Sequence, residues 1–151
     1  LETGAVGINF EDQIVGGEGL YDLAVQVERI RAVRAACTAF GVDAFINART
    51  DCFLQSAPED HSSALMDQAI ERGHAYAEAG ASGFFVPGLV DPSAIERVCA
   101  QCALPVNVMM SKTTPNPLSL RDIGVARISY GPGPWREAMA HLSTAAKQAL
   151  G

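Results

Sequence analysis

The sequence predicts an α/β fold, in which the strands of a parallel sheet alternate with helices. Three observations lead to this prediction. Five apolar, β-prone runs recur along the chain, amphipathic or alanine-rich stretches separate them, and the connections between them are short. No linker-like or low-complexity segment interrupts the alternation, so residues 1–151 are expected to form a single domain.

The predicted strands are rich in β-branched and aromatic residues, as expected for strands that are covered on both faces. They are Ala5–Phe10, Ala44–Ala48, Gly83–Val86, Pro105–Met110 and Val125–Tyr130. A glycine precedes four of them closely, at Gly4, Gly41, Gly80 and Gly124. Glycine is suited to end a preceding helix in the left-handed conformation, so each of these positions predicts a boundary between helix and strand.

Apolar residues at steps of three or four predict helices between the strands. The last predicted helix carries Trp135, Met139 and Leu142 at these steps. Asp91-Pro92 predicts a helix start, because aspartate can cap the first turn and proline fits its first position. The predicted helices are Asp22–Phe40, about Ser62–Ala79, one starting at Asp91, a short one near Leu118–Ile123, and about Pro134–Leu150.

The composition is that of an ordinary globular protein, with 48% hydrophobic and 19% charged residues. The net charge of −6 argues against nucleic-acid binding, which needs clustered Lys and Arg, and no apolar run is long enough for a membrane span. The first residues show no secretory signal, and the missing initiator Met indicates processing or a missing upstream portion. We therefore expect a cytoplasmic protein with reduced cysteines. Cys99 and Cys102 form a C-x-x-C pair, but no second Cys/His pair completes a zinc site, so core packing is expected.

Polar residues inside the predicted strands indicate how the sheet is arranged. Asn9 and Glu11 share one face of the first strand, and Asn47, Arg49 and Asp51 share one face of the second. Further polar positions lie in the later strands, at Asn107, Arg127 and Ser129. A polar face near the strand ends favours a shared barrel lumen over an open doubly wound sheet. A complete barrel has eight strands and about 250 residues, however, so about three βα units are missing.

Five motifs, in this order, carry a resemblance to a known superfamily. They are "GAVGINFEDQ" (4–13), "FINARTD" (45–51), "YAEAGASGFFVPG" (76–88), "PVNVMMS" (105–111) and "GVARISYG" (124–131). Over nearly its whole length the chain resembles the isocitrate lyase/phosphoenolpyruvate mutase superfamily. The resemblance implies a partial (β/α)8 TIM-type barrel, made of five C-terminal βα units of eight.

The resemblance also implies a function. It predicts an Mg²⁺-dependent lyase- or mutase-like enzyme that acts on C–C or P–C bonds of a small 2-oxo or enol carboxylic acid through an enolate-like intermediate. The family keeps its metal-binding aspartates in a segment upstream of this match. The expected partners are the small carboxylate substrate and further copies of the chain in a homo-oligomer.

By the same resemblance, Glu11 supports the Mg²⁺ site through bound water, which suits a hard cation that keeps several waters. Arg49 holds the substrate carboxylate or phosphonate, because guanidinium binds such anions in bidentate fashion. Asn47 and Asn107 complete the expected substrate-binding set deeper in the lumen. Alternatives remain open: Glu11 and Arg49 form a structural ion pair, Asn47 orients Arg49, and Asn107 is a satisfied core amide.

Two departures from the superfamily limit the reactions that we expect the chain to catalyse. Lyases of the superfamily carry a Lys-Lys/Arg-Cys-Gly-His loop after the "EDQ" strand, whereas residues 14–20 contain no Cys, Lys or His. Pro87 stands where phosphoenolpyruvate mutase has a histidine.

Two further residues lie near the candidate site. The side chain of Asp12 points to the opposite face from Glu11, which favours a helix-facing or capping role. Cys52 lies near the predicted mouth without a sign of activation.

A second hypothesis is not catalytic. The chain would then be a catalytically incompetent barrel fragment that persists through self-association or a partner, because open sheet edges favour association.

Overall fold

The computed structural model describes all residues, Leu1–Gly151, and contains one parallel sheet of five strands in the order β1-β2-β3-β4-β5. The strands are β1 (Gly7–Glu11), β2 (Phe45–Arg49), β3 (Gly83–Phe85), β4 (Val106–Met109) and β5 (Arg127–Ser129). The helices are α1 (Leu23–Phe40), α2 (Ser63–Glu78), α3 (Pro92–Gln101), α4 (Pro117–Asp122) and α5 (Gly133–Leu150), with short 3₁₀ turns at Cys52–Leu54 and Pro58–Asp60.

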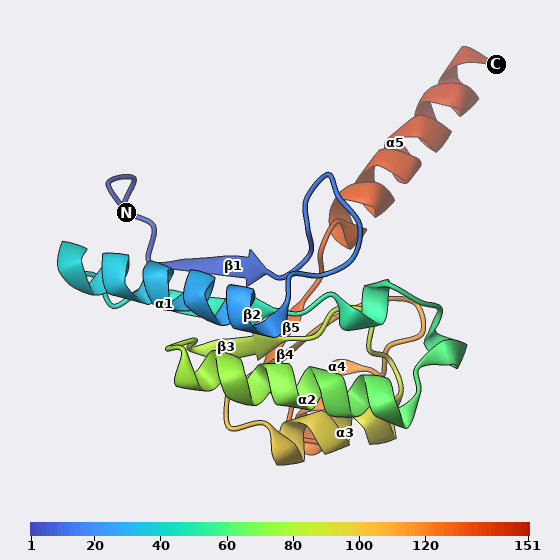
Figure 1. The fold of residues 1–151 in the computed structure, drawn as a ribbon. Coiled ribbons are helices and arrows are strands. Elements are labelled where there is room, and N and C mark those ends of the chain that lie inside the picture. Colours follow the sequence, from blue (N-terminus) through green and yellow to red (C-terminus); the bar gives the residue numbers. More distant parts are fainter.

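The strand order identifies the sheet as part of a barrel wall. Each strand pairs in parallel with the next strand of the chain, and no crossover reverses the order. The helices α1, α2 and α3 lie along the same face of the sheet (Figure 1). An open doubly wound sheet would reverse its order and carry helices on both faces. The prediction of a partial (β/α)8 barrel is confirmed, and the open-sheet alternative is wrong.

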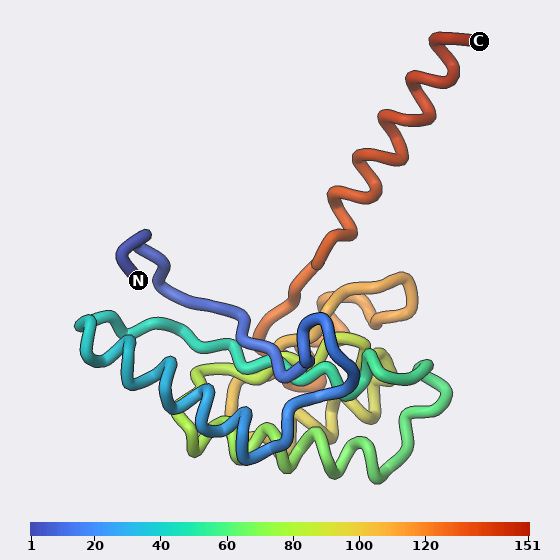
Figure 2. Tube along the Cα trace, turned by 45° about the horizontal axis from the view of Figure 1, so that its top comes forward, coloured from blue at the N-terminus to red at the C-terminus, as the bar shows by residue number.

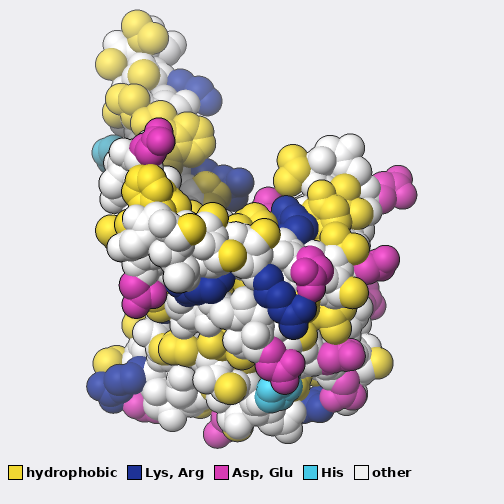
Figure 3. All heavy atoms as spheres, turned by 60° about the vertical axis from the view of Figure 1, so that its left-hand side comes forward, with side chains coloured by type: hydrophobic (Ala, Val, Ile, Leu, Met, Phe, Trp, Pro, Cys, Tyr) yellow, Lys and Arg dark blue, Asp and Glu magenta, His cyan; other side chains and the backbone are white.

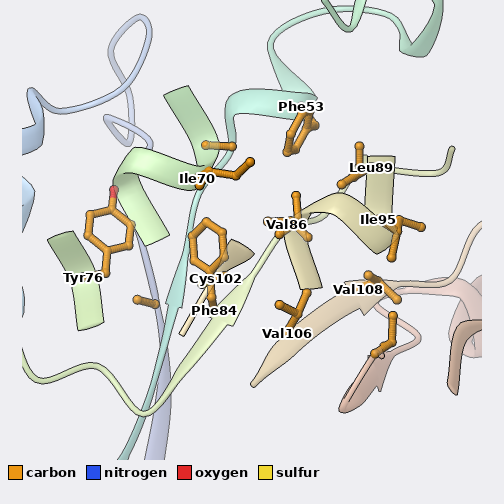
Figure 4. Close-up of a cluster of buried hydrophobic side chains, with 14 of the residues drawn as sticks. Phe53, Ile70, Tyr76, Phe84, Val86, Leu89, Ile95, Cys102, Val106 and Val108 are labelled. Carbon is orange, nitrogen blue, oxygen red and sulfur yellow. The ribbon is translucent and has the colours of Figure 1, made fainter. Parts of the chain in front are cut away.

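The core lies between the sheet and the helices. Its 18 buried residues include Phe84 and Val86 from the third strand region, Val106 and Val108 from β4, and residues of α2, α3 and α4. Figure 4 shows these side chains packed together, with the ring of Tyr76 at one end of the cluster. The strand residues of this core alternate with those of the opposite face, so that face is left for polar side chains.

The predicted bounds of the strands and helices are confirmed to within two residues, but no helix precedes β1 at Gly4. Gly41, Gly80 and Gly124 follow α1, α2 and α4 with positive φ angles of 76°, 98° and 94°. Asp91 caps α3 by accepting a hydrogen bond from the backbone N–H of Ala94 at 2.8 Å. The first strand continues one residue beyond its predicted end, because Glu11 pairs in register with Arg49.

Helix α5 differs from the other helices because none of its residues is buried. It projects away from the sheet and the other helices (Figure 2). Trp135, Met139 and Leu142 are 66%, 41% and 60% exposed, and apolar side chains run along the projecting helix in Figure 3. None of the helices combines the length and the apolar character that crossing a membrane requires.

Gly73 of α2 gives a test of the packing between helix and sheet. A Cβ at this position would lie 2.9 Å from Cys102 Sγ and 3.1 Å from Phe84 Cε1. We expect Gly73→Ala to lower the free energy of unfolding by about 1–2 kcal/mol, because overpacking outweighs the better helix propensity of alanine. Thermal or urea unfolding measures this change.

The matched control is Gly133→Ala, since a Cβ at Gly133 in α5 meets nothing within 4 Å. It should leave stability unchanged or raise it slightly. Equal stability of the two variants would contradict the packing described for α2.

Candidate functional site

The candidate site lies where β1 and β2 end. Glu11 stands directly opposite Arg49 in the parallel register, and Asn9 stands opposite Asn47 one layer below. Arg49 Nη1 lies 3.2 Å from Glu11 Oε2. These side chains occupy the face opposite the helix-packed core, so the two residues predicted to act together do meet on the lumen side.

Asp51 holds the guanidinium of Arg49 in a fixed direction. Nε donates to Asp51 Oδ1 at 2.6 Å and Nη2 donates to Oδ2 at 3.0 Å, while the Asp51 side chain is fully buried. Burial by itself lowers the pKa of Arg49, but the hydrogen bond and charges of Asp51, with Glu11, raise this pKa above its usual value. Asp51 leaves the second Nη2 hydrogen and the Nη1 group of Arg49 unoccupied, and Nη1 lies against the partly exposed Glu11.

A layer of amides lies below the charged pair. Asn47 Nδ2 donates to Asn9 Oδ1 at 2.7 Å, and Asn107 Nδ2 donates to Ser129 Oγ at 3.1 Å. Asn47 and Asn107 are each 1% exposed, and they line a hollow of about 320 Å³ on this face. The Oδ1 atom of Asn47 has no hydrogen-bond partner. Neither amide contacts Arg49 through a hydrogen bond, so this layer is separate from the Arg49 guanidinium.

Asp12, the residue after Glu11, faces the helices and is fully buried. Its Oδ2 accepts hydrogen bonds from Tyr76 Oη at 2.8 Å and Arg72 Nη1 at 3.1 Å. Its Oδ1 accepts one from the backbone N–H of Asp51 at 2.9 Å. The helix-facing role expected for Asp12 is confirmed, whereas Arg72 and Tyr76 are partners that the sequence analysis missed.

The loop between β1 and α1 is closed at its base. Gln13 and Leu20 form an isolated antiparallel bridge, and the backbone N–H of Tyr21 donates to Asp12 O at 2.8 Å. The guanidinium of Arg29 lies 4.1 Å from the centre of the Tyr21 ring and 4.7 Å from that of Phe10. The base of the loop therefore packs tightly against α1 at the mouth of the candidate site.

The carboxylates fit a metal ion only in part. The chain brings together no group of three His, Cys, Asp or Glu side chains that could hold a metal. Asp12 and Asp51 are buried and hydrogen-bonded, which leaves Glu11, with a side chain 36% exposed, as the lumen carboxylate at the strand ends. One carboxylate acting through water is a contribution that Mg²⁺ sites use, with the other ligands coming from elsewhere.

Three of the four cysteines, Cys52, Cys99 and Cys102, lie in surroundings that keep the thiol protonated. Burial raises the pKa of the Cys52 thiol, which also contacts Thr50 Oγ1 at 2.9 Å. Burial likewise raises the pKa of Cys99 to about 11 and the pKa of Cys102 above its usual value. Thiols of this kind are protonated at neutral pH, so the packing role expected for the C-x-x-C pair is the one that the structure favours.

The comparisons with known proteins agree with this fold. The phosphoenolpyruvate phosphomutase family matches residues 1–150. A crystal structure from Burkholderia cenocepacia J2315, provisionally assigned as a phosphonomutase, is 46% identical with a TM-score of 0.95, and the match covers 98% of this chain and 59% of that chain.

Two curated relatives are also similar to the chain. An uncharacterized protein of Mycobacterium tuberculosis is 31% identical over 150 residues, which are 97% of this chain and 52% of the relative. A protein of Corynebacterium glutamicum named Probable 2-methylisocitrate lyase 2 is 30% identical over 163 residues, with 99% of this chain and 48% of the relative covered. The chain spans about half the length of the curated relatives it matches.

The raised pKa of Cys99 predicts a specific pH dependence of alkylation. Because the thiolate is the reactive form and the pKa is about 11, its alkylation rate should still rise about tenfold per pH unit between about pH 8 and 9.5. Peptide mass spectrometry after iodoacetamide treatment measures the rate, with glutathione as the reference thiol. A rate that levels off below pH 9 would contradict the burial described here.

Proposed function

The chain belongs to the phosphoenolpyruvate phosphomutase family, and from this premise we propose that it provides the anion-binding side of an Mg²⁺-dependent lyase- or mutase-like enzyme. The proposed substrate is a small 2-oxo or enol carboxylic acid, in which a C–C or P–C bond is formed or broken. A cytoplasmic location is part of the proposal.

The observation that carries the proposal is the meeting of Glu11 and Arg49 on the lumen face, at the carboxyl ends of β1 and β2. Active sites of barrel enzymes lie at this end of the strands. A cation and a carboxylate side by side, both partly exposed, suit a ligand that brings an anion and a divalent ion together.

Arg49 would bind the substrate carboxylate through the N–H groups that Asp51 leaves free. Asp51 keeps the Arg49 guanidinium in one orientation, so less side-chain entropy is lost when the substrate binds. Glu11 would hold Mg²⁺ through water, and the metal would supply a Lewis acid for the oxygen that gains charge as an enolate forms. Asn47 and Asn107 would close the lumen below the substrate with amide groups.

The loop after β1 limits the reaction class. Residues 14–20 contain no cysteine, lysine or histidine, so they offer no acid of the kind that isocitrate lyase-like members use. The proton donor or acceptor of the reaction would therefore come from another segment. This reasoning favours a reaction on a small 2-oxo acid over isocitrate or methylisocitrate cleavage.

A second candidate function follows from the incomplete barrel. Strands β1 and β5 are both edges of the sheet, and exposed edges promote pairing with other chains. Helix α5 is an isolated amphipathic helix, and such helices depend on packing for their stability. The alternative is a catalytically incompetent barrel fragment that is stabilised by association.

We also propose that the protein forms a homo-oligomer. Trp135, Met139 and Leu142 form an apolar stripe on α5 that is exposed to water, and burying this stripe would be favourable. A second copy of the chain would offer the same stripe in a symmetric contact. This proposal is compatible with both candidate functions, because a complete enzyme and a fragment would each have to cover α5.

Turnover and binding in the full-length protein test the enzymatic proposal. Arg49→Met should weaken binding of oxalate, a planar dicarboxylate probe, by on the order of a hundredfold, because a charged bidentate contact is lost. Glu11→Gln should weaken the Mg²⁺ dependence of oxaloacetate consumption. It should tighten metal-free oxalate binding, because a negative charge that competes for Arg49 Nη1 is removed. Calorimetry and a coupled assay provide the two measurements.

Arg97→Met is the matched control, since it removes an arginine that pairs with Asp67 at the surface between α3 and α2. It should leave oxalate binding and turnover unchanged. Absence of oxalate binding and of turnover with any small 2-oxo acid, with and without Mg²⁺, would rule out the enzymatic proposal and favour the alternative.

Substitutions on α5 test the oligomer. Leu142→Glu places a charge in the apolar stripe and should weaken association by more than about tenfold. Thr144→Glu is the control, because residue 144 lies on the opposite side of the helix. Size-exclusion chromatography with light scattering at several concentrations measures both. A wild-type chain that stays monomeric would contradict the proposal.

A further inference from the structure

Behind the site, on the helix side of the sheet, lies a buried charged cluster that the proposed function does not use. Asp12 is 0% exposed and Arg72 is 6% exposed, and Tyr76 Oη lies within hydrogen-bond distance of both. None of these side chains faces the lumen. We propose that the Arg72–Asp12 pair is a positioning device that sets the direction of the Arg49 guanidinium and fixes the base of the loop 13–21.

Stability does not explain this cluster. Taking two charges out of water is costly, and apolar replacements of buried ion pairs are often neutral or stabilising. The pair is also incompletely satisfied, because Arg72 Nε has no hydrogen-bond partner. Burial lowers the pKa of Arg72, but Tyr76 and Asp12 raise it above its usual value, so the group is charged. Because the guanidinium donors have a fixed planar geometry, an arginine held in this way fixes the positions of the groups that it binds.

The first path from the pair leads to Arg49. Asp12 binds the backbone on both sides of Thr50. The backbone N–H of Asp12 donates to Arg49 O at 3.1 Å, and Asp12 Oδ1 accepts from the backbone N–H of Asp51 at 2.9 Å. The Asp51 carboxylate in turn accepts hydrogen bonds from Nε and Nη2 of Arg49. Arg72 and Tyr76 fix the Asp12 carboxylate, so they fix the backbone position from which Asp51 reaches Arg49.

The second path leads to the loop. Arg72 Nη2 donates to Tyr21 O at 3.1 Å, and the backbone N–H of Tyr21 donates to Asp12 O at 2.8 Å. Asp12 lies at the start of the loop and Tyr21 at its end. One ion pair therefore joins both ends of the loop to the residues that aim Arg49, and it couples the geometry of the mouth to that of the anion site.

This inference rests on the proposed function, in which Arg49 binds a carboxylate. Arg72, Asp12 and Tyr76 are positioning residues and not catalytic residues, because they lie on the far side of the sheet from the ligand. Their substitution should change affinity through Arg49 alone. A purely structural role would leave the affinity of the folded protein unchanged, whatever the loss of stability.

The test uses the full-length protein with the double substitution Asp12→Leu and Arg72→Met, an apolar replacement of similar shape. The variant leaves the buried Tyr76 hydroxyl and the Asp51 backbone N–H without partners, so its melting temperature should fall. It should nevertheless stay folded at the temperature of the binding assay, because the costly charged pair is removed as a whole. Its affinity for oxalate in the presence of Mg²⁺ should fall by on the order of ten- to hundredfold, because the Arg49 guanidinium is no longer fixed. Arg97→Met, the surface control, should change neither quantity.

A second readout does not depend on ligand binding. In ¹H–¹⁵N spectra of arginine side chains, the Nε–H of Arg49 should give a resolved, slowly exchanging signal, which Arg49→Lys removes and so assigns. The double variant should lose this protection. If the wild type binds no oxalate, the proposed function fails and this signal still tests the positioning role. A folded double variant with unchanged affinity and an unchanged signal overturns the inference.

If the double variant does not fold, Arg72→Lys takes its place. Lysine keeps the charge, but a single ammonium group cannot reproduce the fork that reaches both Asp12 and Tyr21 O. It should lower oxalate affinity at least threefold in the wild-type background and have no effect in an Arg49→Lys background. Equal losses in the two backgrounds, or no loss in either, overturn the inference.

Discussion

The register between β1 and β2 is the constraint on which the site depends. Gly7 stands opposite Phe45, and from there the two strands pair residue by residue up to Glu11 and Arg49. A side chain at Gly7 would meet Phe45 O at 2.9 Å, so the glycine permits the close approach with which this ladder begins. A slip by one residue would turn Glu11 toward the helices and Asp12 toward the lumen. The fold thus decides which of two neighbouring carboxylates meets the solvent.

The carboxylates of Glu11 and Asp12 therefore lie in different environments, although the two residues are adjacent in sequence. Glu11 stays partly exposed and has one charged neighbour, Arg49, while its backbone carbonyl is held by Gln26 and Arg29 from α1. Asp12 is buried and makes contacts with both the helix side and the next strand end. The strand end therefore has a rigid side that faces the helices and an adaptable side that faces the lumen. A site that must bind and release a ligand needs both properties.

Much of the fold could be predicted from the sequence because its signals are local. Glycines after helices, the Asp91 cap and the alternation within strands each act over a few residues, and they placed the elements and the lumen face. The network around Asp12 could not be predicted in this way. Arg72 lies 60 residues from Asp12 and resembles the other arginines of the helices, so only the packing of α2 against the end of β1 selects it. The apolar stripe on α5 likewise indicates that another surface packs on this helix, but the stripe alone does not predict which surface that is.

The two acidic neighbours of Arg49 differ in a way that bears on how an anion could enter. Asp51 is fully buried and holds two nitrogens, so displacing it would leave a charge without partners in the protein interior. Glu11 makes a single contact of 3.2 Å from a side chain that is 36% exposed. An arriving carboxylate would therefore replace Glu11 at Nη1 and leave Asp51 in place. The Glu11 carboxylate, released from the guanidinium, would then be free to interact with the water shell of a cation. If the proposed roles hold, anion binding at Arg49 and cation binding at Glu11 would be parts of one rearrangement.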